Sequence, residues 1–256
     1  MPVTTTIKAL PLTEQMLRER LKDHVYLMYL NFSFFIKGAV VVVGGAAIYF
    51  ILSTSGNDFK LQQVALWITS FSFSLVTIAT WSRGSAFTNA RANPWDIVLP
   101  IALGMCEGLL FAVLAPSKDA PQVWVFWYLV YGLFATCAAG LVLNRLNQAH
   151  PLNYAADLRA KVKDYRKWLF EDIEGACGTA VLGFTAFIFC QCFPFLQEPS
   201  AWPYHVAVGF FLTAVAIKLI KQSSSQYEEL TELEIKKDRP ENGAVAGLAI
   251  RPSERQ

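Results

Sequence analysis

A single carboxylate within a long apolar stretch is the most chemically informative residue of this sequence. Residues 96–115, DIVLPIALGMCEGLLFAVLA, are long enough to cross a bilayer, and Glu107 lies near their middle. Lipid contains no water to solvate a charge, so an ionisable group at that depth must face protein or a water-filled cavity, or else carry a proton. Glu107 is therefore the first candidate for an ion or proton site.

Lys37 is the candidate counter-charge for Glu107. It lies about 10 Å past the membrane interface that Tyr26 and Tyr29 are predicted to mark, where its side chain can snorkel to lipid headgroups, or can reach Glu107 if the two spans adjoin. The sequence favours snorkelling, and contact with Glu107 is the alternative. Three further polar residues are candidates for lining an ion pathway: Thr77, Asp172 and Glu174.

Each of these three residues also has a purely structural interpretation. The hydroxyl of Thr77 belongs to a polar stripe in the second predicted span, and such hydroxyls can bond to carbonyls of their own helix. Asp172 and Glu174 stand where the fifth predicted span begins, and acids at a helix start interact favourably with the helix dipole. The sequence leaves both interpretations open.

Sequence motifs for catalysis are missing. No H-E-x-x-H, G-x-S-x-G, Walker A or G-x-G-x-x-G pattern occurs. His205 lies on the opposite side of the predicted membrane from His24 and His150, so the three are not expected to share a haem or metal site. Each histidine is predicted to lie at a membrane interface with its hydrogen bonds satisfied. The five cysteines all fall inside predicted spans, which favours packing over a disulfide framework or a metal site. We therefore expect no catalytic residue, no metal, no cofactor and no enzymatic activity.

The composition predicts an all-α, polytopic membrane protein. Apolar residues make up 54% of the 256 residues and charged residues 16%, and the apolar residues are concentrated in blocks of about twenty or more. A membrane β-barrel requires alternating polarity, whereas residues 39–50 are apolar on every side. Six blocks are predicted to be transmembrane helices, arranged as three hairpins: residues 28–53, 61–82, 96–115, 123–145, 173–196 and 203–221.

The basic residues predict the orientation of these spans. Of the 22 lysines and arginines, the three loops on one side hold only Lys60 and Lys118. The positive-inside rule then places both termini in the cytoplasm and the protein in the cell membrane or an inner membrane. An even number of spans also requires both termini on one side. No nucleic-acid motif accompanies the basic loops, which are expected to contact anionic lipid headgroups.

The remaining segments are predicted to lie on the cytoplasmic side of a transmembrane domain at residues 27–221. Residues 1–26 are expected to form an amphipathic helix, and a second amphipathic helix is expected to lead into the fifth span. Residues 222–239 form a third helix whose narrow apolar stripe could pair with a copy of itself or with a cytoplasmic protein partner. Residues 240–256 are expected to be a disordered tail.

Glycines at intervals of four or eight residues are predicted to let helices pack closely. Such small-residue ridges bring helix backbones together in membranes and imply no chemistry. They are expected to hold the bundle or its homo-oligomer together. The residues are Gly104, Gly108, Gly132, Gly140, Gly175 and Gly183.

Three functions are compatible with these features. The leading hypothesis is an integral membrane protein that self-associates and forms or regulates a cation or proton pathway, with Glu107 as its key residue. The alternative is a non-enzymatic structural or sensor subunit of a membrane complex that recruits a cytoplasmic partner. The third hypothesis is a secondary transporter of a small solute.

Overall fold

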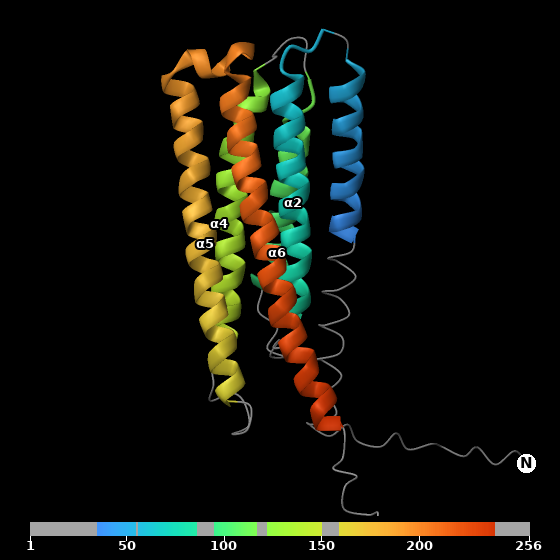
Figure 1. The fold of residues 1–256 in the computed structure, drawn as a ribbon, viewed down its shortest axis with the longest axis vertical. Coiled ribbons are helices and arrows are strands. Elements are labelled where there is room, and N and C mark those ends of the chain that lie inside the picture. The colour runs from blue at the N-terminus through green and yellow to red at the C-terminus, as the bar shows by residue number, and fades with distance from the viewer. Residues whose placement is uncertain (1–34, 55, 86–94, 117–121, 150–158, 239–256) are drawn as a thin grey trace, which may run out of the picture.

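The fold was analysed in a computed structural model of the 256-residue chain (Figure 1). The structure describes residues 35–54, 56–85, 95–116, 122–149 and 159–238. The helix predicted at residues 1–26 and the tail predicted at residues 240–256 lie outside these ranges. Within them, every element of regular secondary structure is a helix, which confirms the all-helical fold class.

Six long helices make up the described part of the chain. They are the helix Phe35–Ser53, α2 (Lys60–Ser85), α3 (Trp95–Ala112), α4 (Phe126–Gln148), α5 (Arg159–Cys192) and α6 (Trp202–Asp238). Three short 3-10 helices lie at the upper end of the bundle in Figure 1: η1 (Val123–Val125), η3 (Pro194–Gln197) and η4 (Pro199–Ala201). We call the opposite end, where α5 begins, the lower end.

Five of the six helices are long and apolar enough to cross a membrane, and α3 is the exception. Its apolar part, Val98–Ala112, is shorter than the others. The sequence predicted that this span continues to residue 115. In the structure, the N–H groups of Leu114 and Ala115 bond to carbonyls three residues back, which forms a tight turn before Pro116. With 18 residues, α3 is about 27 Å long, slightly less than a hydrocarbon core of ~30 Å.

The amphipathic segment predicted before the fifth span is the first part of α5 itself. Arg166 fixes it to the end of α4, because its Nη1 donates to the carbonyl oxygens of Leu146 at 2.7 Å and Ala149 at 3.1 Å. These bonds satisfy carbonyls that the end of a helix leaves without partners. Three buried side chains at helical spacing pack against the same two residues: Val162, Tyr165 and Leu169.

The six helices pack in a different pattern from three separate hairpins. α3 and α4 pack together as predicted, but α5 packs chiefly on α4 and α6 packs chiefly on α2. Figure 1 shows α5 at one edge of the bundle and the helix Phe35–Ser53 at the other, with α6 and α2 between them. α5 and α6 are therefore neighbours in the chain whose main partners are other helices.

Small and hydroxylated residues join α2 to α6. The Thr69 hydroxyl lies 3.0 Å from the carbonyl oxygen of Gly209 and 3.2 Å from the hydroxyl of Thr213. A Cβ at Gly209 would lie 3.3 Å from the Cβ of Ala65, so the two helices approach closely there. The contact residues Thr69 and Gly209 are 140 residues apart in sequence.

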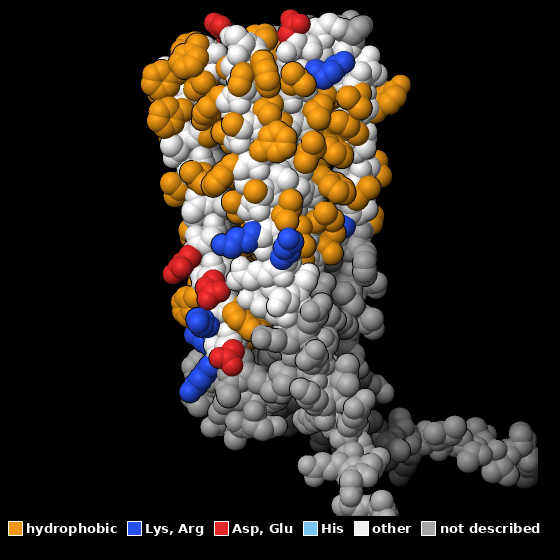
Figure 2. All heavy atoms as spheres, viewed as in Figure 1, with side chains coloured by type: hydrophobic (Ala, Val, Ile, Leu, Met, Phe, Trp, Pro, Cys, Tyr) orange, Lys and Arg blue, Asp and Glu red, His pale blue; other side chains and the backbone are white. Residues whose placement is uncertain are grey.

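The outer surface of the bundle is apolar over most of its height. Figure 2 shows hydrophobic side chains covering the upper part of the face in view, with most charged side chains below them. We call this surface the apolar belt; its large exposed residues include Val42, Leu133, Val181, Ile188 and Phe210. Exposed hydrophobic area on this scale is expected of helices that face lipid.

Candidate functional site

Three helices at one edge of the bundle bring the candidate residues together. The helix Phe35–Ser53 packs on α3 through a cluster in which Phe111 contacts Val40 and Ala47. It is also held to α2, because the indole N–H of Trp67 donates to the carbonyl oxygen of Gly44 at 2.9 Å. Close approach of this helix to α3 and α2 sets Lys37 opposite Glu107.

Lys37, Thr77 and Glu107 form one hydrogen-bonded cluster, which we call the charged centre. The Lys37 ammonium donates to both carboxylate oxygens of Glu107 and to the hydroxyl of Thr77. Oγ1 of Thr77 lies 2.7 Å from Oε1 of Glu107 and 2.8 Å from the carbonyl oxygen of Ser74. A hydroxyl has one proton, so Thr77 donates to one of these two acceptors at a time.

The charged centre is almost completely removed from solvent. The side chain of Glu107 is 1% exposed and that of Lys37 is 12% exposed. A buried carboxylate without a counter-charge is strongly unfavourable, so the pairing with Lys37 is what makes this burial tolerable. Lys37 therefore follows the alternative that the sequence left open, contact with Glu107, and the preference for snorkelling was wrong.

Glu107 lies closer to the lower end of the bundle than its place in the sequence suggests. Thr77, which contacts it, is 17 residues after Lys60 and only three residues before the end of the apolar segment Lys60–Thr80. At helical rise this is about 25 Å from the upper end of α2 and about 5 Å from the lower end of the segment. The centre of an apolar stretch in sequence is therefore not the centre of the bundle here.

Asp172 and Glu174 do not join the charged centre. Both lie on α5, which packs on α4, whereas the charged centre is built from the helix Phe35–Ser53, α2 and α3. Figure 1 places α5 at the edge of the bundle opposite the helix Phe35–Ser53. Glu174 is exposed and Asp172 is half-buried. Of the five predicted pathway residues, the structure brings together three.

Most hydroxyls of α2 bond to carbonyls of their own helix, whereas the buried Ser74 hydroxyl has no hydrogen-bond partner among the described residues. Thr69, Ser70 and Ser72 each donate to the carbonyl four residues back, at distances from 2.9 to 3.0 Å, and Thr80 does the same at 2.9 Å. This geometry agrees with the structural interpretation of the stripe. Ser70 also accepts a hydrogen bond from the indole N–H of Trp127 on α4, at 2.8 Å.

The glycines that were predicted to mediate helix packing fall into two groups, those that contact a neighbouring helix and those that do not. At Gly183 a Cβ would lie 2.8 Å from the backbone nitrogen of Gly132, and at Gly104 it would overlap the side chain of Ile36. Gly140 lies against Leu99 of α3 at an ordinary contact distance. At Gly108 and Gly175, no described heavy atom lies within 4 Å of such a Cβ, so these two do not mediate helix packing within the described bundle.

A second polar cluster, the neutral centre, lies near the upper end and was not predicted. His205 is completely buried, and its Nε2 lies 2.7 Å from the carbonyl oxygen of Leu196. A carbonyl only accepts, so Nε2 carries a proton, and Nδ1 of the neutral ring accepts from the Tyr128 hydroxyl at 2.7 Å. Trp124 packs edge-on against the imidazole, 4.6 Å between ring centroids.

The two centres differ in the chemistry they allow. The charged centre holds two ionisable groups of opposite sign, so a proton or a small cation can compete with Lys37 for Glu107. The neutral centre uses both ring nitrogens of His205 to join α4, η3 and α6. Among the described residues, no three His, Cys, Asp or Glu side chains are grouped to hold a metal ion.

Comparison with known proteins adds no family assignment. No protein-family model, curated protein or solved structure matches the chain. The function is therefore argued from the geometry of the charged centre and from its position in the bundle.

Proposed function

We propose that this chain is a multi-pass membrane protein that forms or regulates a pathway for protons or small cations, with the charged centre as a latch at the lower end. The observation that carries the proposal is the Lys37 ammonium bound to both oxygens of a carboxylate that is 1% exposed. Ionisable side chains inside membrane bundles are rare, and a pair of them suggests an ion or proton route as the first hypothesis.

The proposed topology has six spans and both termini in the cytoplasm. It combines the five long apolar helices with α3, whose length of about 27 Å needs only slight thinning of the bilayer. The distribution of basic residues supports this orientation, which puts the lower end, and with it the charged centre, on the cytoplasmic side. The protein acts without a cofactor and without enzymatic chemistry in this proposal.

The latch works through competition for one carboxylate. While Lys37 holds Glu107, its ammonium contacts both carboxylate oxygens, neutralises their charge and repels a second cation. When Lys37 withdraws, Glu107 becomes a proton acceptor or cation ligand, and the Thr77 hydroxyl is a neighbouring oxygen ligand. In the helix Phe35–Ser53, 22% of the apolar window is buried, against 50% in α2, so less protein surrounds this helix than surrounds its partner α2.

The test is ion flux through liposomes containing the purified full chain. Lys37→Met releases the carboxylate, so we expect it to raise proton or cation flux about tenfold, as a shift of about 1.4 kcal/mol in the latch equilibrium would do. Glu107→Gln removes the acceptor and is expected to abolish the flux, as is the double variant Lys37→Met/Glu107→Gln.

A matched control is available at the other end of the bundle. Lys60→Met removes a lysine whose ammonium bonds only to the carbonyl oxygen of Leu52 in the described structure, at 3.3 Å, and should leave the flux unchanged. Flux equal to that of empty liposomes in the wild type and in Lys37→Met would overturn the ion-pathway proposal.

One observation favours a second candidate, a non-enzymatic subunit of a membrane complex. α6 runs to Asp238, twelve residues beyond its apolar segment Pro199–Gln226, and offers a helix outside the membrane for a cytoplasmic partner. In this case the charged centre only fastens three helices. Pull-down from detergent with the full chain and with a variant lacking residues 227–256 tests it; loss of a specific partner, with no ion flux, supports the subunit.

A further inference from the structure

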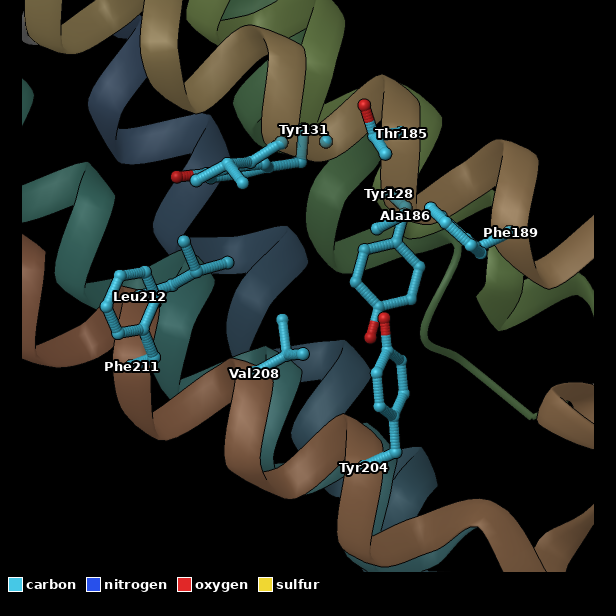
Figure 3. Close-up of a pocket in the computed structure, with 11 residues that line it drawn as sticks. Tyr128, Tyr131, Thr185, Ala186, Phe189, Tyr204, Val208, Phe211 and Leu212 are labelled. Carbon is cyan, nitrogen blue, oxygen red and sulfur yellow. The ribbon is translucent and has the colours of Figure 1, made fainter.

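A groove between α5 and α6 opens on the side of the bundle, with α4 as its floor (Figure 3). Its upper part is a cavity of about 210 Å³. The floor is formed by Tyr128 and Tyr131, and residues from α5 and α6 form the walls: Leu182, Thr185, Ala186 and Phe189, and Tyr204, Val208, Phe211 and Leu212. Figure 3 shows the Tyr128 and Tyr204 side chains at one end of this space.

The groove faces the surroundings of the bundle and is apolar. Phe211 on one wall is 59% exposed, and Leu182 and Phe189 on the other are 50% and 47% exposed. The groove exists because α5 packs chiefly on α4 and α6 chiefly on α2, which leaves the two neighbours apart. A hydrocarbon chain fits such a lining better than water does.

Below the cavity, two exposed glycines of α5 leave open space beside the helix. Gln222 on α6 donates to Glu171 on α5 at 3.2 Å. α5 and α6 run in opposite directions, so four residues from this contact along each helix Gly175 lies level with Lys218, and Gly178 lies about one turn above. No described heavy atom lies within 4 Å of a Cβ placed at Gly175 or Gly178, so the space beside them is open.

Charges of both signs stand at the lower mouth of this groove. Lys218 and Lys221 are exposed on α6, and Lys218 shares a helix face with Phe211 and Tyr204. Across the mouth, the carboxylates of Glu171 and Glu174 are exposed on α5. Figure 2 shows basic and acidic side chains gathered below the apolar belt. A zwitterionic headgroup matches this arrangement better than a purely anionic one.

The length of the groove also matches one leaflet. From Lys218 to Val208 is ten helical residues, about 15 Å, which is half of a ~30 Å hydrocarbon core. An acyl chain whose headgroup lies at Lys218 would therefore end inside the cavity, beside Val208.

We propose that the α5–α6 groove binds one phosphatidylethanolamine molecule of the leaflet at the lower end. Its phosphate lies at Lys218 and Lys221, its ammonium at Glu171 and Glu174, and one acyl chain runs past Gly178 into the cavity. This inference requires only that α5 and α6 lie in a membrane. It does not depend on an ion pathway, so either proposal can fail without the other.

Native mass spectrometry of the full chain in mild detergent tests the proposal. Phosphatidylethanolamine, phosphatidylglycerol and phosphatidylcholine with identical acyl chains are added in turn. We expect one phosphatidylethanolamine to remain bound most tightly. Lys218→Ala should weaken its binding about fivefold, the contribution of one basic side chain near a lipid surface. Gly178→Leu should weaken it by about tenfold or more, because the new side chain fills the path of the acyl chain.

Two controls separate the groove from general effects. Gly45→Leu places the same side chain at another open glycine, on the helix Phe35–Ser53, and Lys163→Ala removes an exposed lysine outside the groove; both should bind lipid like the wild type. Equal retention of lipid in Gly178→Leu and Gly45→Leu would overturn the proposal, as would equal binding of all three headgroups. A lipid-free dimer that buries α5 and α6 would overturn it too.

Discussion

The charged centre at the lower end of the bundle and the neutral centre near its upper end join helices by different chemistry. In the charged centre, Lys37 and Glu107 neutralise each other in a site where neither charge is well solvated. In the neutral centre, His205 donates one hydrogen bond and accepts another, and no charge needs compensation. Each centre links three elements of the fold, and both centres are buried.

The difference lies in what happens when one partner is lost. A lone buried charge remains unfavourable until it moves or takes a proton, so the two charges of the charged centre are stable in their buried positions only together. Hydrogen bonds between neutral groups are lost one at a time and each contributes modestly. The charged centre is therefore suited to switching between two states, whereas the neutral centre is suited to holding one.

Lys37→Met alone is expected to have the largest effect on stability. It leaves the Glu107 carboxylate buried without its counter-charge, and breaking a buried pair in this way costs about 3 kcal/mol or more. The free energy of unfolding in detergent, measured by denaturant titration, should fall by that amount. The double variant Lys37→Met/Glu107→Gln should recover most of the loss. Equal losses in the single and double variants would show that the two charges are not coupled.

His205→Phe should have the next largest effect. The ring volume is kept, but the Tyr128 hydroxyl and the Leu196 carbonyl lose their partner in an apolar setting, for a loss of about 2 kcal/mol in the free energy of unfolding. Tyr128→Phe removes only one of the two bonds and should lose about half as much. If Tyr128→Phe lost as much as His205→Phe, the neutral centre would behave as a single unit and its contrast with the charged centre would disappear.

The sequence singled out Glu107 but not the neutral centre, and the partners in both centres depend on how the helices pack. Glu107 was conspicuous because it is a lone acid in an apolar stretch, but whether Lys37 meets it depends on which helices adjoin, and no local pattern encodes that. His205 was expected to be a satisfied residue, whereas its partner Tyr128, 77 residues away, looks in sequence like any aromatic residue of an apolar helix.

The glycines show the same limit. Gly175 and Gly183 have the same spacing within α5 as Gly132 and Gly140 within α4, yet Gly183 meets the backbone of Gly132 while Gly175 faces open space. Spacing predicts a smooth ridge on a helix, which was right for Gly183 and Gly132. It cannot predict whether a helix, a lipid or another chain lies opposite, because that depends on how α5 crosses α4.

Thr77→Val should have the smallest effect and sharpens the comparison most. Valine keeps the shape of threonine but removes the hydroxyl that accepts from Lys37 and lies 2.7 Å from Glu107, so the charged centre keeps its ion pair and loses these two hydrogen bonds. The free energy of unfolding should fall by about 1 kcal/mol, since side-chain hydrogen bonds inside membrane proteins contribute about 0.6 kcal/mol each on average. Ser72→Ala is the control, since the Ser72 hydroxyl donates to the Ile68 carbonyl of its own helix, and it should change little. A loss in Thr77→Val as large as in Lys37→Met would mean that the hydroxyl, and not the pairing of charges, holds Glu107 in place.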